Sequence, residues 1–290
     1  MRVIGKPSLV SAEVDLAFKS IPRFCYRSHF SKISTSSLES DKGWCCCFRS
    51  TQGILSQFFI RFKEKNPKQY QGLFGDVNPL TLFYDKADAP FSIQNLVTNA
   101  SKYGIPIGKW GKPSKIAFGI QDIFKSLNLS CIVGQHFTIL QSDIDSATFP
   151  SLVLIPGLFG LRKMDPQYIP FLQLCLCIPD SLGFISGKKN SAFFFCGFDQ
   201  KQFVYFDPHV LKTAAVSEND IPSFFSLPQK TILCESINPS ILLAFMCENK
   251  DSLFCLLQIL LGCSPTPVGI TNDGEIEKAL ESTLDIDDIV

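Results

Sequence analysis

Short apolar runs that end at Gly, Pro or Asp crowd the second half of the chain, and they constrain its fold more than any other feature. These runs predict six strands, over residues 130–133, 151–155, 172–178, 191–197, 202–206 and 240–247. The segment GFDQK at 197–201 resembles a hairpin turn between two of them. Strands joined by such short connections favour antiparallel pairing.

Helical spacing instead marks the first half of the chain. From Asp41 onward, one apolar stripe recurs at helical intervals and consists of Cys47, Thr51, Ile54, Leu55, Phe58, Phe59 and Phe62. Further helices are predicted over 91–100, 113–127 and 251–261, whereas 66–79 is rich in Gly, Pro and Gln and is typical of a loop. Helices first and a mostly antiparallel sheet later predict an α+β fold.

The composition excludes some classes of protein. The chain has 290 residues, of which 46% are hydrophobic, so it can bury a large core as one large domain or two small ones. Lys plus Arg and Asp plus Glu both number 27, so the net charge gives no general attraction to nucleic acid or to anionic lipid.

The twelve cysteines indicate a reducing compartment. Glu13 and Asp15 interrupt the region where a signal peptide needs an apolar run, and the most apolar segments are too short to span a bilayer. We therefore expect reduced thiols in the cytoplasm. The chain has no C-x-x-C spacing and only three histidines, so neither a metal site nor a cofactor is predicted.

Both ends of the chain differ from its middle. Residues 1–22 are predicted to be a loosely ordered lead-in. The sequence turns polar near residue 264, and 273–290 carry seven acidic residues against one lysine. Such a composition favours a mobile tail over 264–290. The remaining residues, 23–263, are expected to form the folded domain.

Two segments offer the parts of a thiol nucleophile and its base. Cys46 lies near the predicted start of the first long helix, where unpaired amides and the helix dipole favour a thiolate. Asp207 and His209 follow a predicted strand and are two residues apart, so in extended backbone their side chains project to the same face. A carboxylate beside an imidazole fixes its tautomer and supports its charged form. Cys46, His209 and Asp207 are thus candidate catalytic residues.

Each of these patterns also has a structural interpretation. A single cysteine in an apolar region more often packs than reacts. Asp followed by Pro is also a common way to open a turn. Spacing alone leaves both interpretations open.

Several motifs, taken together and in one order over about residues 24–261, resemble the autophagins, which are autophagy-specific cysteine peptidases. The nucleophile motif D-x-G-W-G-C-M-x-R corresponds to 41–49 (DKGWCCCFR), and Gln52 also matches. Other segments that match the family are 24–30 (FCYRSHF), 89–97 (APFSIQNLV), 108–113 (GKWGKP), 152–156 (LVLIP), 168–170 (YIP), 181–187 (SLGFISG), 205–209 (YFDPH) and 237–241 (INPSI).

The resemblance implies a papain-like peptidase domain over 23–263 in which Cys46, His209 and Asp207 form a triad. By the same resemblance, Tyr26 contributes its hydroxyl to an oxyanion hole, and Trp110 covers the channel that holds the end of the substrate. The implied substrate is a ubiquitin-like modifier, cleaved after its C-terminal glycine both as a precursor and as a conjugate with phosphatidylethanolamine. The implied enzyme is a monomer.

Two departures from the family pattern matter, and two alternatives to an autophagy peptidase stay open. Cys45 stands where the family has glycine, and Cys47 stands where it has methionine. A side chain at position 45 is expected to narrow the channel, shift the oxyanion amide or compete as a thiol. One alternative is therefore a protein that binds the modifier but has little or no peptidase activity. The other is a peptidase for a second small modifier of the Ufm type, whose enzymes share G-W-G-C and D-P-H motifs.

Overall fold

Five of the six predicted strands meet in one sheet, in a computed structural model that describes residues 1–6, 11–34 and 36–272. The spatial order is β10 (Gln229–Leu233), β8 (Gln202–Phe206), β7 (Ala192–Asp199), β6 (Ser181–Gly187), β11 (Ser240–Cys247), β5 (Ser151–Leu158) and β3 (Ser130–Val133), while β1 (Arg2–Val3) pairs with β7. Only the β3–β5 pair is parallel in this sheet. The prediction of a mostly antiparallel sheet in an α+β fold is confirmed.

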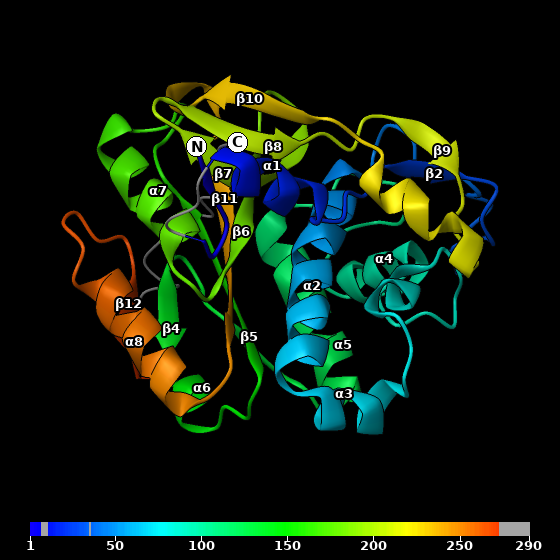
Figure 1. Cartoon of the computed structure of the whole chain (residues 1–290), viewed down its shortest axis with the longest axis horizontal. Helices are drawn as coiled ribbons and strands as arrows, with labels where there is room; N and C mark the ends of the chain where they lie inside the picture. The colour runs from blue at the N-terminus through cyan, green and yellow to red at the C-terminus, as the bar shows by residue number, and fades with distance from the viewer. Residues whose placement is uncertain (7–10, 35, 273–290) are drawn as a thin grey trace.

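The helices cover the sheet unequally. They are α1 (Ser11–Lys19), α2 (Cys46–Lys65), α3 (Pro67–Phe74), α4 (Ile93–Ser101), α5 (Pro113–Ser126), α6 (Gln141–Asp145), α7 (Ile169–Cys177) and α8 (Lys250–Leu261). Short 3₁₀ turns occupy Pro79–Phe83, Pro166–Tyr168, Glu218–Phe225 and Cys234–Ser236. Figure 1 shows α2 to α5 gathered on one side of the molecule, with α7 and α8 at the other.

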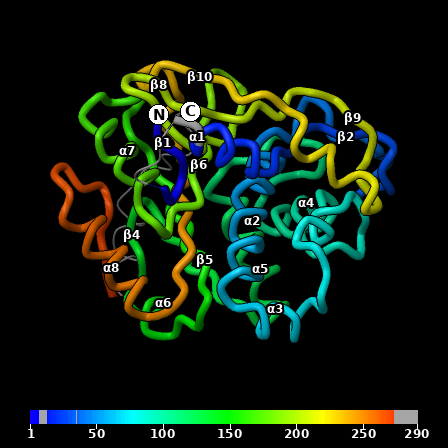
Figure 2. Tube along the Cα trace, in the orientation of Figure 1, coloured from blue at the N-terminus to red at the C-terminus, as the bar shows by residue number. Residues whose placement is uncertain are grey.

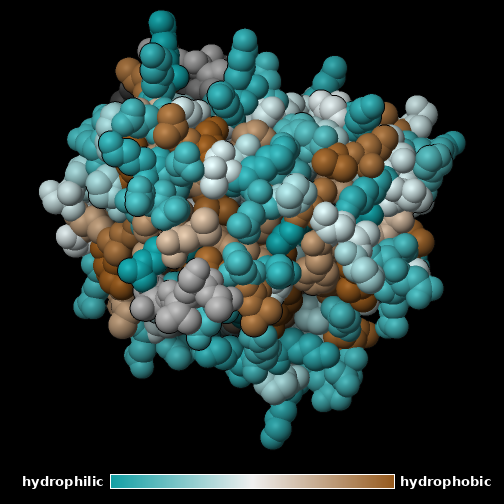
Figure 3. Space-filling view, turned by 45° about the horizontal axis from the view of Figure 1, so that its top comes forward, coloured by the Kyte–Doolittle hydropathy of each residue, from teal (hydrophilic) through white to brown (hydrophobic). Residues whose placement is uncertain are grey.

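Two small parallel sheets complete the fold. β2 (Tyr26–Ser28) pairs with β9 (Leu211–Thr213), and β4 (Thr138–Leu140) pairs with β12 (Gly269–Thr271). The β2–β9 pair joins two segments that are far apart in the sequence, one before α2 and one just after β8. On the face drawn in Figure 3, hydrophilic side chains predominate and apolar patches are small.

The first long helix is the centre of the core. All seven residues of its predicted stripe are buried, and so is every residue of α2 from Cys46 to Phe59. The helix begins at Cys46, in agreement with the prediction that Cys46 lies near its start. Gly43, three residues earlier, has a φ of +90°, which a right-handed helix cannot contain.

Two element predictions are wrong, and one central strand was missed. Residues 172–177 of the predicted strand 172–178 belong to α7, and the expected loop at 66–79 contains α3. The strand β6 was not predicted, although it lies in the middle of the sheet and is buried along its whole length. The remaining predicted strands and helices are confirmed to within a few residues at their ends.

The N-terminal segment contains structure that the sequence did not lead us to expect. β1 pairs with β7, and Phe18 of α1 is buried in the core. Figure 2 shows this part of the trace, in blue, running close to the sheet. The division of the chain at residues 22 and 263 stays a prediction, and the tail over 273–290 lies outside the described residues.

Candidate active site

The chain enters α2 through a turn that only glycine adopts easily. Gly43 has a φ of +90°, and a β-carbon there would meet nothing within 4 Å, so its requirement is one of backbone conformation and not of space. Cys46 is the first residue of α2 and its side chain is 1% exposed. The first amides of a helix have no partner inside the helix, so the N–H groups around Cys46 are available to an anion.

A buried ion network holds this turn in place. Asp41 accepts a hydrogen bond from the Arg27 amide (2.6 Å) and pairs with Nε of Arg49 (2.5 Å). Arg49 also pairs with Asp85 (2.8 Å) and donates to Gln52 Oε1 (3.0 Å). The residues that bracket the nucleophile in the sequence motif, Asp41 and Arg49, are therefore a structural pair that ties the loop to the helix.

The carboxylate and the imidazole of the second motif meet as predicted. Asp207 Oδ1 lies 2.6 Å from Nδ1 of His209 and also accepts the His209 amide at 3.0 Å. The other carboxylate oxygen accepts a hydrogen bond from Lys230 Nζ of β10 (2.7 Å). Because Asp207 occupies Nδ1, the ring nitrogen left to face the thiol is Nε2.

Four groups from separate parts of the chain surround the Cys46 sulfur. Trp110 donates its Nε1–H to the sulfur at 3.3 Å, and His209, the Ala192 amide and the Tyr26 hydroxyl also hydrogen-bond to it. The Tyr26 ring contacts the imidazole edge-on, with ring centroids 5.4 Å apart. All five residues predicted from the sequence therefore lie together.

These contacts decide the protonation of the pair. Burial acts to raise the pKa of Cys46, but the hydrogen bonds from His209, the Ala192 amide and Trp110 outweigh it, so that the pKa is lowered overall. The hydrogen bonds to Asp207 and Cys46 raise the pKa of His209 to about 9. The two shifts have opposite signs, and together they favour a thiolate–imidazolium pair near neutral pH.

The Tyr26 hydroxyl stays protonated beside this pair. Burial, and then the neighbouring Cys46, raise the pKa of Tyr26. A neutral hydroxyl is a hydrogen-bond donor, which is what an oxyanion hole requires.

Cys45 and Cys47 lack the hydrogen bonds that surround the Cys46 sulfur, and the backbone of Cys45 is unstrained. Burial raises the pKa of both thiols well above the ordinary value. Cys45 has a φ of −104°, a conformation open to any residue. The backbone at position 45 therefore does not require glycine.

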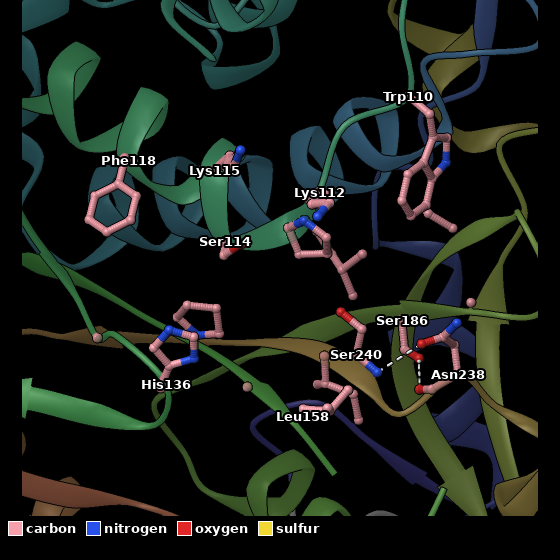
Figure 4. A pocket seen from close by; sticks show the side chains of 18 of the residues that line it. Trp110, Lys112, Ser114, Lys115, Phe118, His136, Leu158, Ser186, Asn238 and Ser240 are labelled. Atoms are coloured by element: carbon pink, nitrogen blue, oxygen red, sulfur yellow. Dashed lines mark hydrogen bonds between the residues drawn. The ribbon is translucent and has the colours of Figure 1, made fainter. Parts of the chain in front are cut away.

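A cavity of about 360 Å³ lies along the first turns of α5, beside two of the groups that contact the Cys46 sulfur. Its walls come from the loop before α5, from the first turns of α5 and from the ends of β5, β6, β7 and β11. Trp110 and Ala192, which both contact the sulfur, also line the cavity. Figure 4 shows the Trp110 indole at one end and His136 at the other.

Sequence reasoning missed two members of the site. The Ala192 amide is a backbone group, so the type of residue at position 192 does not indicate its role in the site. Lys230 lies on β10, which was not predicted, and it reaches Asp207 only because β10 pairs with β8. A cation on the strand beside Asp207 could have been sought only after the pairing of the strands was known.

Two searches bear on other kinds of site. Within residues 1–6, 11–34 and 36–272, no group of three or more His, Cys, Asp or Glu side chains is placed to hold a metal ion. No helix in the described part of the chain has the length and apolarity needed to cross a bilayer.

Comparison with known proteins shows the family to which the chain belongs. The chain is 29% identical to the cysteine protease ATG4A of Mus musculus and 27% identical to that of Homo sapiens, in each case over 86% of this chain and 75% of the relative. It is 27% identical to the cysteine protease ATG4b of Arabidopsis thaliana, over 82% of this chain and 59% of the relative. The model of the peptidase C54 catalytic domain matches residues 11–258. The chain therefore belongs to the peptidase C54 family, the autophagins, and is a cysteine peptidase.

Proposed function

We propose that the enzyme cleaves after the C-terminal glycine of a ubiquitin-like autophagy modifier, both in its precursor and in its conjugate with phosphatidylethanolamine. The observation that carries this proposal is the Cys46 sulfur, which receives hydrogen bonds from Trp110, His209 and the Ala192 amide, two of which also line a neighbouring cavity. In the proposal the enzyme acts as a monomer in the cytoplasm, with 23–263 as the peptidase domain, and needs no cofactor.

The first half of the reaction forms a thioester. The Cys46 thiolate attacks the carbonyl carbon of the terminal glycine, and the carbonyl oxygen becomes an oxyanion. The Tyr26 hydroxyl and the Cys46 amide donate to that oxyanion. His209, as the imidazolium, gives its Nε2 proton to the leaving amine while Asp207 holds the ring. The amine is either the peptide nitrogen of the precursor or the ethanolamine nitrogen of the lipid.

The second half uses the same groups in reverse. Neutral His209 takes a proton from a water molecule, which attacks the thioester carbon. The oxyanion forms again at Tyr26 and the Cys46 amide, and its collapse releases the modifier with a free glycine carboxylate. Throughout, the Trp110 indole covers the narrow part of the channel.

The test is cleavage of a modifier that carries extra residues after its final glycine. The wild-type enzyme should release a product whose mass ends at glycine, and Cys46→Ser should release none. A parallel assay with the modifier coupled to phosphatidylethanolamine in vesicles tests the lipid reaction. Alkylation of Cys46 by iodoacetamide without cleavage of either substrate would refute the proposal.

A further inference from the structure

Two aliphatic side chains stay exposed directly after the imidazole in the sequence. Val210 is 43% exposed and Leu211 is 44% exposed. A single exposed aliphatic residue is common on protein surfaces and indicates no function. These two differ in where they lie, because they follow His209 and neither of them lines the cavity beside Trp110. They lie on the imidazole side of the site, outside the cavity.

The small sheet of β2 and β9 fixes the face to which Leu211 belongs. The two strands are parallel, and Tyr26 pairs with Leu211. The next pair is Arg27 with Lys212, and both of these side chains hydrogen-bond to Ser223. Paired residues of a sheet project to the same face, and successive residues project to opposite faces. Leu211 therefore shares the face of Tyr26, whose hydroxyl contacts the nucleophile.

Backbone contacts hold this segment beside the imidazole. The Pro208 carbonyl accepts hydrogen bonds from the Tyr26 amide (3.0 Å) and from the Val210 amide (2.8 Å). The Tyr26 ring contacts the His209 ring edge-on. Figure 1 shows β2 and β9 at the upper right edge of the molecule, apart from the large sheet. Leu211 is thus fixed at the outer rim of the site, next to Tyr26.

The direction of the reaction decides what approaches this rim. His209 must reach the leaving amine to protonate it, so the leaving group lies on the His209 side of the sulfur. In the lipid conjugate that amine is the ethanolamine nitrogen, and only the ethanolamine carbons and one oxygen separate it from the lipid phosphate. The lipid surface must therefore approach the rim at Tyr26 and His209 whenever the amide reaches the sulfur. The precursor places a soluble peptide there instead.

We propose that Leu211, with Val210 beside it, contacts the lipid surface while the conjugate is cleaved, and that this contact favours the conjugate over the precursor. The occupant follows from the position of the two side chains next to His209 and from the short link between the amide and the lipid. Aliphatic side chains bind a lipid surface by leaving water, and they need no groove to do so, whereas a peptide side chain is held best in a pocket. This inference rests on the proposed function and adds a lipid contact to it.

The experiment compares three forms of one modifier: the precursor, a conjugate with glycerophosphoethanolamine, and a conjugate with phosphatidylethanolamine in vesicles. The soluble conjugate keeps the amide and the phosphate but has neither acyl chains nor a membrane. In Leu211→Gln combined with Val210→Thr, kcat/KM for the vesicle conjugate should fall by about tenfold, because the aliphatic groups no longer enter lipid. Its values for both soluble substrates should stay within about twofold of wild type. Iodoacetamide should alkylate Cys46 at the wild-type rate.

Leu161→Gln is the matched control. Leu161 lies in the loop after β5 and is 72% exposed, which is more than Leu211, and it is not among the groups that contact the Cys46 sulfur. Its replacement should leave kcat/KM unchanged for all three substrates. A loss on the vesicle conjugate in this variant as large as that in the Leu211 variant would overturn the proposed place of the lipid contact.

The pattern of losses over the three substrates decides the inference. Equal losses on the precursor and on the vesicle conjugate would mean that the two side chains bind peptide or the modifier, which would overturn the lipid contact. Equal losses on the two conjugates would place the contact at the phosphate and would overturn it too. Unchanged cleavage of all three would have the same consequence. Each of these results leaves the peptidase proposal standing.

Vesicle binding separates this inference from the proposed function. If the wild type cleaved none of the three substrates, the peptidase proposal would fall. Cys46→Ser would then be sedimented with vesicles that carry the conjugate. Weaker sedimentation of its derivative with Leu211→Gln and Val210→Thr would support the lipid contact by itself, and equal sedimentation would overturn it.

Discussion

At the scale of single residues, three adjacent thiols differ in what surrounds each sulfur. Burial raises the pKa of Cys45 and of Cys47, whereas hydrogen bonds lower that of Cys46. Cys46→Ser should abolish cleavage, and Cys45→Ser and Cys47→Ser should keep most of it. Turnover of the extended modifier and mass spectrometry of the alkylated site measure this. Equal loss in Cys45→Ser would mean that the wrong thiol has been assigned.

The carboxylate behind His209 should set the alkaline limit of activity. The imidazolium has a pKa of about 9, so kcat/KM should rise as the Cys46 thiol ionises and fall as pH passes about 9. Asp207→Asn removes the hydrogen-bonded charge that stabilises the imidazolium. The alkaline limb of the pH profile of kcat/KM should therefore move to lower pH in this variant, and the maximum of kcat/KM should fall.

Removal of the Lys230 charge should move the alkaline limit of activity in the opposite direction. It shares the Asp207 carboxylate with His209, and their hydrogen bonds lower the pKa of Asp207 against the effect of its burial. Lys230→Gln leaves the carboxylate to His209 alone, which should raise the pKa of the imidazolium. Its alkaline limb should move to higher pH. Shifts of the same sign in Lys230→Gln and Asp207→Asn would show that charge at Asp207 does not control the profile.

At the scale of elements, α2 carries ion pairs that differ in burial. Arg49 pairs with Asp41 and Asp85, and none of these side chains is more than 1% exposed. Lys63 pairs with Asp76 at 2.8 Å, near the surface, on the same helix.

Arg49→Met should lower the free energy of unfolding by about 3–5 kcal/mol, because it leaves two carboxylates buried without their partner. Lys63→Met should cost at most about 1 kcal/mol. Urea unfolding of both variants measures the difference. Equal small losses would show that the network around Arg49 does not stabilise the start of α2.

Two elements escaped prediction, each for its own physical reason. α7 is almost wholly apolar, and an apolar run does not distinguish a buried helix from a buried strand. The buried residues Leu172, Cys175 and Leu176 do follow helical spacing. β6 (SLGFISG) is rich in Ser and Gly and lacks a strand signature. Gly183 is nevertheless required, since a β-carbon there would lie 2.4 Å from the Phe195 carbonyl oxygen.

The candidate site was predictable where a side chain defines it. Cys46, Asp207 and Trp110 stood out by residue type and motif, and the structure brings them together. The Ala192 amide and Lys230 were not predictable, because one is backbone and the other depends on which strands pair.

At the scale of the whole molecule, the site lies where the helical part meets the sheet. Cys46 and Trp110 come from α2 and the loop before α5, whereas Ala192, Asp207 and His209 come from the sheet and its ends. Figure 1 shows α2 beside β6 and β7 along this junction. The alignment of the thiol and the imidazole therefore depends on how closely α2 packs on β7.

Gly53 controls that packing. It lies seven residues after Cys46, two turns along α2, and so faces the same way. A β-carbon at Gly53 would lie 2.6 Å from the Phe194 ring, which is 2% exposed on β7. Because Ala192 begins the same strand, any separation of α2 from β7 also displaces the amide that contacts the sulfur.

Gly53→Ala should therefore impair chemistry as well as stability. We expect the free energy of unfolding to fall by about 1–3 kcal/mol, the cost of overpacking. Alkylation of Cys46 and kcat should fall by about tenfold or more, because small displacements of catalytic groups are costly. Phe194→Leu in the same chain should recover part of both losses. Gly72→Ala, on α3 with nothing within 4 Å of the added carbon, should leave both rates unchanged. Wild-type rates in Gly53→Ala would mean that the contact between α2 and β7 does not align the thiol.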